Sequence, residues 1–520
     1  MSLSKKKIKF YSLSFLKHDF RSSITVFFVA LPLCLGISLA SGTPVYSGLL
    51  AGVIGGIIVS AVSGSQLSVS GPAAGLTAVS AAAILQMGSI ESFFLSVAIA
   101  GIIQVFLGVF RLGGFTHFIP SAVIKGMLSA IGIILISKQI PLLIGYDQPD
   151  FWTKELFNIF TLDHAYSHMD NLYHHTSAGV ILISVLLFIF LFAWKKFMGQ
   201  RISFLPASFA TVLFGVLLSL LLHKYFFAFN LKSTQFVSLP TDIFNRVIIP
   251  SVNNFFGNYE IWKTAIVIAI IASLETLLSI EAIDKLDPYN RITPQNRELV
   301  AQGAGNFMSG MLGGIPITAV IVRSSANAEA GARTKTSAFM HGVWLLLAVL
   351  FCVPLVNHIP YCVLAVLLTR TGYQLAKPKM IRSIYKQGRE QFLPFIITVI
   401  AILGTDLLIG VVIGLAYSVY FIIKHTYRAG YTLTKNTEGH IIHYRLELAL
   451  NVSFLNKKRF MDMLDKIPEY SEVTIIGSNS VYIDNDILEI FSSFKSKAHH
   501  RHIQLTLIDI PEVQTIELHG

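Results

Sequence analysis

The feature that most constrains this chain is a series of apolar runs of 18 or more residues that recur from one end to the other. Such runs are long enough to cross the hydrocarbon core of a bilayer as helices. Composition agrees, because 53% of the 520 residues are hydrophobic and 13% are charged. That is about half the charge content of soluble proteins. We therefore expect an α-helical membrane protein.

The apolar runs divide into fourteen predicted spans. They lie at approximately 22–41, 47–64, 70–87, 93–110, 119–138, 177–195, 203–222, 260–283, 297–312, 317–332, 336–355, 359–376, 391–407 and 408–424. The third and the tenth are weak as helices. Each opens with Gly and Pro and continues as a run of small residues that is too short to cross a bilayer alone.

Lysine and arginine residues set the expected orientation. They precede the first span, separate the sixth from the seventh, follow the tenth, separate the twelfth from the thirteenth and follow the last. With the N-terminus inside, all of them lie on the cytoplasmic face, as the positive-inside rule requires. The net charge of +11 is therefore a sign of topology, and no nucleic-acid partner is expected. The residues are Lys5, Lys6, Lys7, Lys9, Lys17, Lys195, Lys196, Arg201, Arg333, Lys335, Lys377, Lys379, Arg382, Lys386, Arg389, Lys424 and Arg428.

This orientation predicts a multi-pass protein of the cell's inner (plasma) membrane with three parts. Residues 1–21 form a cytoplasmic N-terminal tail, 22–430 form a transmembrane domain, and 436–520 form a cytoplasmic domain. The long loops at 139–176 and 223–259 fall outside the membrane on the opposite face and are sparser in Lys and Arg. The sequence therefore predicts the lipid bilayer as one partner of the chain.

The transmembrane domain contains an internal repeat. The third and tenth spans are each the third in a set of seven, at approximately 22–222 and 260–424. Because seven is odd, the second set crosses the membrane in the opposite sense. Paired Gly/Pro-interrupted segments in an inverted repeat are a sequence pointer to a transporter's binding site. The alternative is that Gly and Pro merely let these helices kink or pack closely.

Two half-helices that begin at mid-membrane present free N–H groups and positive dipole ends, which suit an anion. Small side chains there let a ligand approach the backbone closely. We therefore predict a substrate site built mainly from backbone dipoles. Its residues are Ser70, Gly71, Ala73 and Ala74 in the third span, and Thr318, Ala319, Val320 and Ile321 in the tenth.

A carboxylate lies within the eighth span. Glu275 at mid-membrane is costly when charged, so it should bind a proton or a sodium ion, or pair with a cation. Ser279 lies one turn later on the same helix face. Arg323 in the tenth span is the expected charge partner of Glu275, and a purely structural Glu–Arg pair is the alternative. No other cofactor, metal ligand set or catalytic group is predicted.

After residue 435 the hydropathy pattern changes. Strands are predicted at 440–449, 473–477 and 503–508, and helices at 455–466 and 486–497. This alternation predicts a small α/β domain. It has no glycine-rich phosphate loop.

The chain resembles the SulP family of anion permeases over nearly all of its length. The order and spacing of several stretches carry the resemblance, and the tail resembles the STAS domain that follows the membrane part in this family. The stretches are Pro32–Gly42, Pro44–Leu49, Gln66–Pro72, Leu274–Ser279, Asn296–Gly303, Gly313–Pro316, Arg323–Asn327 and Ala330–Thr334.

The resemblance implies a core domain and a gate domain, built from seven-plus-seven inverted repeats, that move against each other, commonly in a homodimer. It implies an anion between the N-termini of spans three and ten, and a coupling carboxylate at Glu275, where sodium-dependent bicarbonate members have Asp. Leu33 stands where many members have Gln. Asp486 stands where related signalling domains have a phosphorylatable Ser, so no phosphoserine switch is expected there.

Several functions remain open on the sequence. A secondary transporter of bicarbonate, sulfate or a similar small anion is expected first, coupled to H⁺ or Na⁺. A dicarboxylate or nucleobase carrier has the same architecture. An anion channel, an electromechanical protein and a membrane-anchored signalling scaffold are the rival classes. An enzyme is not expected.

Overall fold

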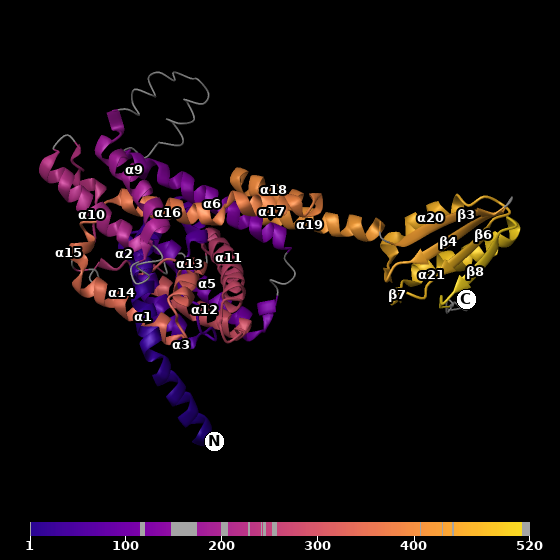
Figure 1. The fold of residues 1–520 in the computed structure, drawn as a ribbon, viewed down its shortest axis with the longest axis horizontal. Coiled ribbons are helices and arrows are strands. Elements are labelled where there is room, and N and C mark those ends of the chain that lie inside the picture. The colour runs from indigo at the N-terminus through magenta and orange to yellow at the C-terminus, as the bar shows by residue number, and fades with distance from the viewer. Residues whose placement is uncertain are drawn as a thin grey trace. The chain divides into compact units, whose positions relative to one another are not determined.

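The computed structural model describes residues 2–114, 120–146, 174–198, 206–226, 229–240, 242, 246–251, 257–405, 407–428, 430–438 and 441–511. The chain divides into two compact units, Met1–Val411 and Val412–Gly520. Figure 1 shows the first unit as a bundle of helices and the second as a smaller body that contains a sheet. The boundary lies inside helix α19 (Leu407–Arg428), which falls on the last predicted span.

Each of the fourteen predicted spans contains a helix of the structure. The elements of the first unit are α1 (Ser2–Ala40), α2 (Val45–Ile54), α3 (Ser60–Val62), β1 (Ser70–Pro72), α4 (Thr77–Met87), α5 (Ile90–Val109), α6 (Ser121–Ile144), α9 (Ala178–Ala193), α10 (Ala207–Tyr225), α11 (Tyr259–Asp284), α12 (Gln295–Met311), β2 (Ile317–Ala319), α13 (Ile321–Glu329), α14 (Thr336–Phe351), α15 (Val353–Val356), α16 (Tyr361–Leu375), α17 (Pro378–Lys386) and α18 (Arg389–Gly404).

Within the described residues, six helices are long and apolar enough to cross a membrane by themselves. The outer surface of α9 suits lipid, because Ile181, Val185, Ile189 and Phe192 are all exposed at helical spacing. An exposed apolar stripe of this kind is what a membrane helix presents to acyl chains. The structure is therefore that of a multi-pass membrane protein, as predicted.

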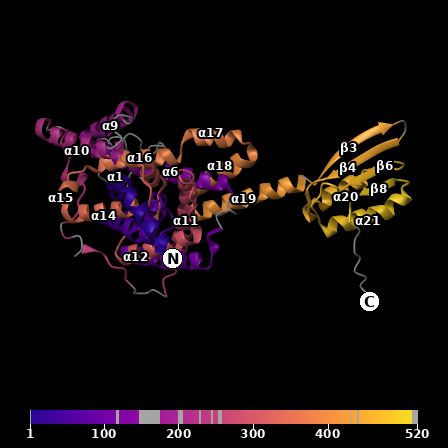
Figure 2. The same ribbon diagram turned by 60° about the horizontal axis from the view of Figure 1, so that its bottom comes forward.

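The helices of the first unit pack in two groups. One group contains α1 to α5 and α11 to α14 with the two short strands, and the other contains α6, α9, α10 and α16 to α18. Each group takes its members from both halves of the sequence. The two groups meet mainly where α1 lies against α16, and there Leu364 and Leu368 pack on Gly36. Figure 2 shows the same bundle from a second direction.

Helices α5 and α12 lie closest together within the first group. A Cβ atom on Gly101 would lie 2.6 Å from the carbonyl oxygen of Gly303, and the reverse holds for Gly303 and Gly101. Glycine is thus required on both helices for the backbones to meet, as in other membrane helix pairs. This close packing fixes α12 beside the centre of the unit.

The second unit is a small α/β fold. Its sheet has the order β3–β4–β6–β8 and is covered by two helices, with an apolar core that contains Phe460 and Phe491. The predicted elements are present with shifts of a few residues. Strand β3, which pairs antiparallel with β4, was not predicted from the sequence. The elements are β3 (Tyr431–Glu438), β4 (Ile441–Leu448), β5 (Asn451–Val452), α20 (Lys457–Asp465), β6 (Glu472–Ile476), β7 (Tyr482–Ile483), α21 (Asn485–His500) and β8 (Gln504–Ile508).

Two further predictions were incomplete. The segment 378–386, predicted as a charged connection, forms helix α17. The predicted outer loop at 139–176 begins later than expected, because α6 continues to Ile144. Most of that loop lies outside the described residues, as does Arg201. The same holds for the side chains of six other basic residues used for the orientation, namely Lys5, Lys6, Lys7, Lys9, Lys195 and Arg428.

Candidate functional site

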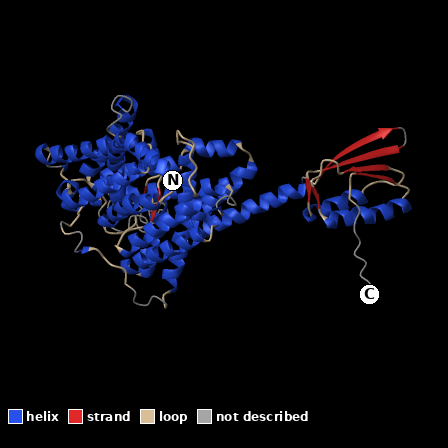
Figure 3. Cartoon of the chain, turned by 90° about the horizontal axis from the view of Figure 1, so that it is seen from below, coloured by secondary structure: helices blue, strands red, loops and turns tan. Residues whose placement is uncertain are grey.

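The third and tenth spans begin with two short strands that pair with each other. Strands β1 and β2 are antiparallel, and Gly71 lies opposite Thr318 in the centre of the pair. All six residues of the pair are buried. Figure 3 shows the strands in red among the surrounding helices. Extended backbone at mid-membrane is tolerated only where protein or a cavity surrounds it. The sequence predicted the interruption of both helices but not the pairing.

The pairing decides which backbone N–H groups remain available. The N–H of Ala73 donates to Pro316, and the N–H of Val320 donates to Val69, so both groups extend the ladder. Helix α13 then begins at Ile321, whose N–H has no acceptor within the helix. Because the strands are antiparallel, the helices that follow them begin at opposite ends of the pair.

The strand pair has two different faces, because neighbouring residues in a strand point to opposite sides. Ser70 and Ala319 share one face. On this face the Ser70 hydroxyl accepts a hydrogen bond from Gln302 at 2.6 Å. At the edge of β2 the Ala319 N–H donates to Thr276 Oγ1 at 3.2 Å. Gly71 and Thr318 share the other face. The hydroxyl of Thr318 is buried and has no partner among the described residues.

Arg323 lies on the Gly71 face of the pair. Its guanidinium occupies the space that a Cβ atom at Gly71 would take. The side chain has no exposed surface, and none of its three nitrogen atoms is hydrogen-bonded to an oxygen or nitrogen atom of the described residues. The polar neighbours of Arg323 are His341 of α14 and the thiol of Cys34 of α1, which is a weak and uncharged hydrogen-bond acceptor for the guanidinium. A buried cation without a counter-ion leaves a strong local preference for an anion.

Glu275 lies against the first turn of the other half-helix. A Cβ atom on Gly75 would lie 2.7 Å from Glu275 Oε2, and the Gly75 N–H donates to the carboxylate. The Oε2 atom is buried without a hydrogen bond. Ser279 follows one turn later on α11 and is also buried.

The expected pairing of Glu275 with Arg323 was wrong. No ion pair joins the two residues, and both have unpartnered polar atoms within the described part of the chain. The reason is geometric. Glu275 bonds to Gly75 in the 3₁₀ turn (Ala74–Leu76) that precedes α4, whereas Arg323 lies against Gly71 of β1. Each charged side chain therefore meets the strand–helix segment of the third span at a different point.

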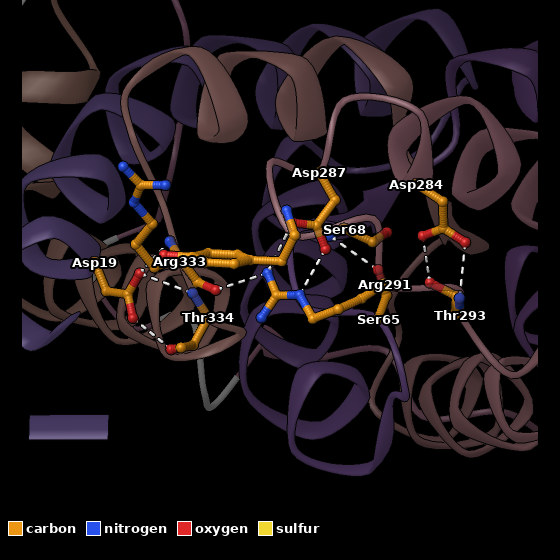
Figure 4. A network of polar contacts seen from close by, with 10 residues as sticks. Asp19, Ser65, Ser68, Asp284, Asp287, Arg291, Thr293, Arg333 and Thr334 are labelled. Atoms are coloured by element: carbon orange, nitrogen blue, oxygen red, sulfur yellow. Dashed lines mark hydrogen bonds and ion pairs between the residues drawn. The ribbon is translucent and has the colours of Figure 1, made fainter. Parts of the chain in front are cut away.

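A polar network holds the connection between α11 and α12 (Figure 4). Arg291 Nε donates to Asp287 Oδ2 at 2.6 Å, and Arg291 Nη2 donates to the carbonyl oxygen of Arg333 at 2.9 Å. Burial opposes ionisation of Asp287, but the hydrogen bonds from Arg291 prevail and hold the pKa of Asp287 below its usual value.

The same network reaches α1. Asp19, which is fully buried, accepts hydrogen bonds from the backbone N–H groups of Arg333 and Thr334 (Figure 4). Asp284 binds the N–H and the hydroxyl of Thr293 at 2.7 and 2.6 Å. The middle of α1 is thus tied to the segments that follow α11 and α13.

The buried polar residues of α12 were not predicted from the sequence. Glu298, Gln302, Asn306 and Ser309 are all fully buried and lie on one face of the helix. Their spacing of four, four and three residues inside an apolar span was a signal that this face meets something polar. That partner is the strand pair and the loops that precede it.

A family model described as the sulfate permease family matches residues 16–398. The chain is 24% identical to the "Putative sulfate transporter YvdB" of Bacillus subtilis (strain 168), over 97% of this chain and 93% of that protein. It is also 24% identical to the "Bicarbonate transporter BicA" of Picosynechococcus sp. (strain ATCC 27264 / PCC 7002 / PR-6), over 77% of this chain and 69% of that protein.

Solved structures have the same fold. The transmembrane domain of a cyanobacterial bicarbonate transporter BicA matches with a TM-score of 0.63 and 23% identity, over 78% of this chain and 97% of that chain. A structure of SLC26A9 matches with a TM-score of 0.75 and 15% identity, over 96% of this chain and 86% of that chain.

Proposed function

The chain belongs to the sulfate permease family, and on that premise we propose that it is a secondary transporter of small inorganic anions, bicarbonate or sulfate. The family consists of transporters, so the chain is a membrane anion transporter and not an enzyme. The identity of its substrate, its coupling ion and the movement that carries the anion across the membrane are all proposed.

The observation that carries the proposal is the buried, unpartnered guanidinium of Arg323 beside Gly71. Leaving one member of a buried charge pair without its partner costs about 3–5 kcal/mol. A bound anion offsets that cost. It would lie between Arg323, the Thr318 hydroxyl and the free N–H groups at the start of α13, where the dipole of α13 adds to the attraction. Gly71 leaves room for the guanidinium at the strand.

Because the strands pair with each other, fewer of the predicted groups remain free to contact the anion. The Ser70 hydroxyl and the Ala73 and Val320 N–H groups are engaged in other bonds. Ala74, Ala319 and Ile321 contribute small or apolar surface and, for Ile321, a backbone N–H. The proposed site therefore depends more on one cation than the sequence suggested.

Glu275 is proposed as the coupling group. Its carboxylate has the Gly75 N–H on one side and an unpartnered Oε2 on the other, so a proton or a sodium ion can be accommodated there. Ser279 offers a hydroxyl one turn away. A cation bound at Glu275 together with an anion at Arg323 would let the loaded carrier move with its charge compensated. Glu rather than Asp favours the proton.

The proposed movement is between the two groups of helices. The group with the strand pair is the core domain that carries the anion, and the group with α6, α9, α10, α16, α17 and α18 is the gate domain. We also propose that the chain forms a homodimer in the cell's inner (plasma) membrane. Its N-terminus and its C-terminal α/β unit would be cytoplasmic, and that unit would be a STAS domain.

A dicarboxylate or nucleobase carrier is the alternative within this architecture, and an anion channel is the alternative in mechanism. A panel of labelled bicarbonate, sulfate and fumarate in proteoliposomes separates them, with and without imposed proton or sodium gradients. The proposal expects uptake of an inorganic anion above its equilibrium level when a gradient is imposed. Flux that only equilibrates points to a channel, uptake of fumarate alone points to the dicarboxylate carrier, and no flux points to a signalling scaffold.

A further inference from the structure

We propose that Gln104 and Asn306 are positioning residues that hold β2, and with it the anion site, through a relay of side-chain amides. The relay runs from Ser273 of α11 through Gln104 of α5 and Asn306 of α12 to Ile317 of β2. The inference rests on the proposed function in one respect, namely that the anion binds beside β2.

Asn306 forms the same hydrogen bonds with the backbone of Ile317 that a neighbouring strand would form. Its Nδ2 donates to the carbonyl oxygen of Ile317 at 3.0 Å, and its Oδ1 accepts from the N–H of Ile317 at 2.6 Å. Two bonds to one residue are the pattern of an antiparallel partner. Asn306 is therefore a one-residue substitute for a third strand at the edge of a two-stranded pair.

The edge needs such a substitute because the pair is buried in the membrane unit. An unsatisfied backbone group away from water costs several kcal/mol in hydrocarbon, so a displaced β2 would have to find new partners. Asn306 has no exposed surface, so its amide makes these bonds away from bulk solvent. The register of Ile317 then determines where Thr318 lies, one residue further along the strand.

Gln104 fixes the orientation of the Asn306 amide. Its Oε1 accepts from Asn306 Nδ2 at 2.7 Å, and its Nε2 donates to Ser273 Oγ at 3.1 Å. If the Asn306 amide turned over, its oxygen would face the oxygen of Gln104, and both bonds to Ile317 would be lost. Gln104 thus acts on β2 only through Asn306. Ser273 lies two residues before Glu275, so the relay also joins the helix of the coupling carboxylate to the strand.

The test uses the full chain in proteoliposomes with labelled sulfate and labelled bicarbonate as probes. The variants are Asn306→Leu, Gln104→Leu and the double variant. Gln139→Leu is the matched control, because Gln139 of α6 is equally buried and neither of its amide atoms has a partner among the described residues. Arg323→Gln reports separately on the proposed site. Hydrogen exchange of the segment that contains Ile317 is measured on the same samples.

We expect Asn306→Leu to raise KM by about tenfold and Gln104→Leu to raise it by about threefold. The value of kcat should change less, because the variants remove hydrogen bonds that hold the site and leave the moving helices unchanged. The double variant should be no worse than Asn306→Leu. Exchange at Ile317 should be faster in Asn306→Leu than in wild type and unchanged in Gln139→Leu.

The outcomes separate the two hypotheses. If Arg323→Gln raises KM while Asn306→Leu leaves it unchanged, the positioning role is wrong and the site stands. Effects of the two Leu variants that multiply in the double variant would show that Gln104 acts independently, which also overturns the relay. If neither probe is transported, the proposed function fails. The hydrogen-exchange measurement then tests the relay by itself. Protection of Ile317 in Asn306→Leu that equals its protection in wild type would overturn the relay.

Discussion

The guanidinium of Arg323 lies where the Cβ atom of residue 71 would be, and only glycine leaves that space free. We predict that Gly71→Ala weakens anion binding by about tenfold or more, because the new methyl group must displace the cation or the strand. Gly114→Ala is the matched control, since a Cβ atom there meets nothing within 4 Å. The measurement is the concentration dependence of anion uptake. Equal KM values for the two variants would place the anion elsewhere.

Glu275→Gln should separate binding from coupling. The amide oxygen can still accept from the Gly75 N–H, but the side chain can no longer exchange a proton or carry the charge that a sodium ion needs. Anion exchange between equal concentrations should remain at least partly intact. Acceleration by a pH or sodium gradient should be abolished.

The control for that variant is Glu281→Gln on the same helix, where the exposed carboxylate pairs with Lys285 at 3.0 Å. An exposed pair contributes little, so gradient-driven uptake should be unchanged. Full gradient-driven uptake by Glu275→Gln would show that the residue is structural.

The ion pair of Asp287 and Arg291 should make stability depend on pH. Hydrogen bonds from Arg291 hold the pKa of Asp287 below its usual value, despite burial. The folded state therefore gains stability above the unfolded pKa of about 3.9, and this gain is lost as the pH falls through the lower folded pKa. Thermal unfolding in detergent should show wild type above Asp287→Asn at pH 6. The difference should shrink below about pH 4. A constant difference across this range would mean that the charge of Asp287 does not matter.

Removal of the C-terminal unit should leave anion binding measurable. The strand pair, Arg323 and Glu275 all lie in the unit that ends at Val411. The cut belongs after Arg428, where α19 ends, rather than after residue 436 inside β3. Asn456 donates to the carbonyl oxygens of Thr426 and Tyr427, so its loss should fray the last turn of α19. Stability and transport rate should fall, whereas affinity should not. Complete loss of binding by a well-folded truncated chain would contradict this division.

The spans and the interrupted helices could be predicted because they depend on local sequence. A helix that crosses lipid must be apolar over its whole length, and Gly71–Pro72 and Gly314–Pro316 break that pattern visibly. The same argument identified Glu275 and Arg323 as the ionisable groups that need an explanation. Their positions along the chain were therefore readable from the sequence.

Their partners were not readable, because partners depend on tertiary geometry. Opposite charges suggested that Glu275 and Arg323 pair, but the carboxylate bonds to the N–H of Gly75 instead. Every residue except proline has a backbone N–H group, so the sequence does not show which of these groups will act as the donor. The pairing of β1 with β2 was missed for the same reason, since three residues are too few for a strand pattern. The role of Asn306 was not predicted either, because it depends on Ile317 lying at the edge of a strand pair.

The most direct test of the account compares anion uptake by wild type, Arg323→Gln and Arg370→Gln in proteoliposomes. Arg370 of α16 is the matched control, a half-buried arginine of another membrane helix that makes no ion pair in the described structure. The account predicts saturable uptake of sulfate or bicarbonate by wild type and by Arg370→Gln. For Arg323→Gln it predicts KM raised by at least about tenfold, because the buried cation beside the strands is gone. Wild-type KM in Arg323→Gln, with normal protein levels, would contradict an anion site at the strand pair.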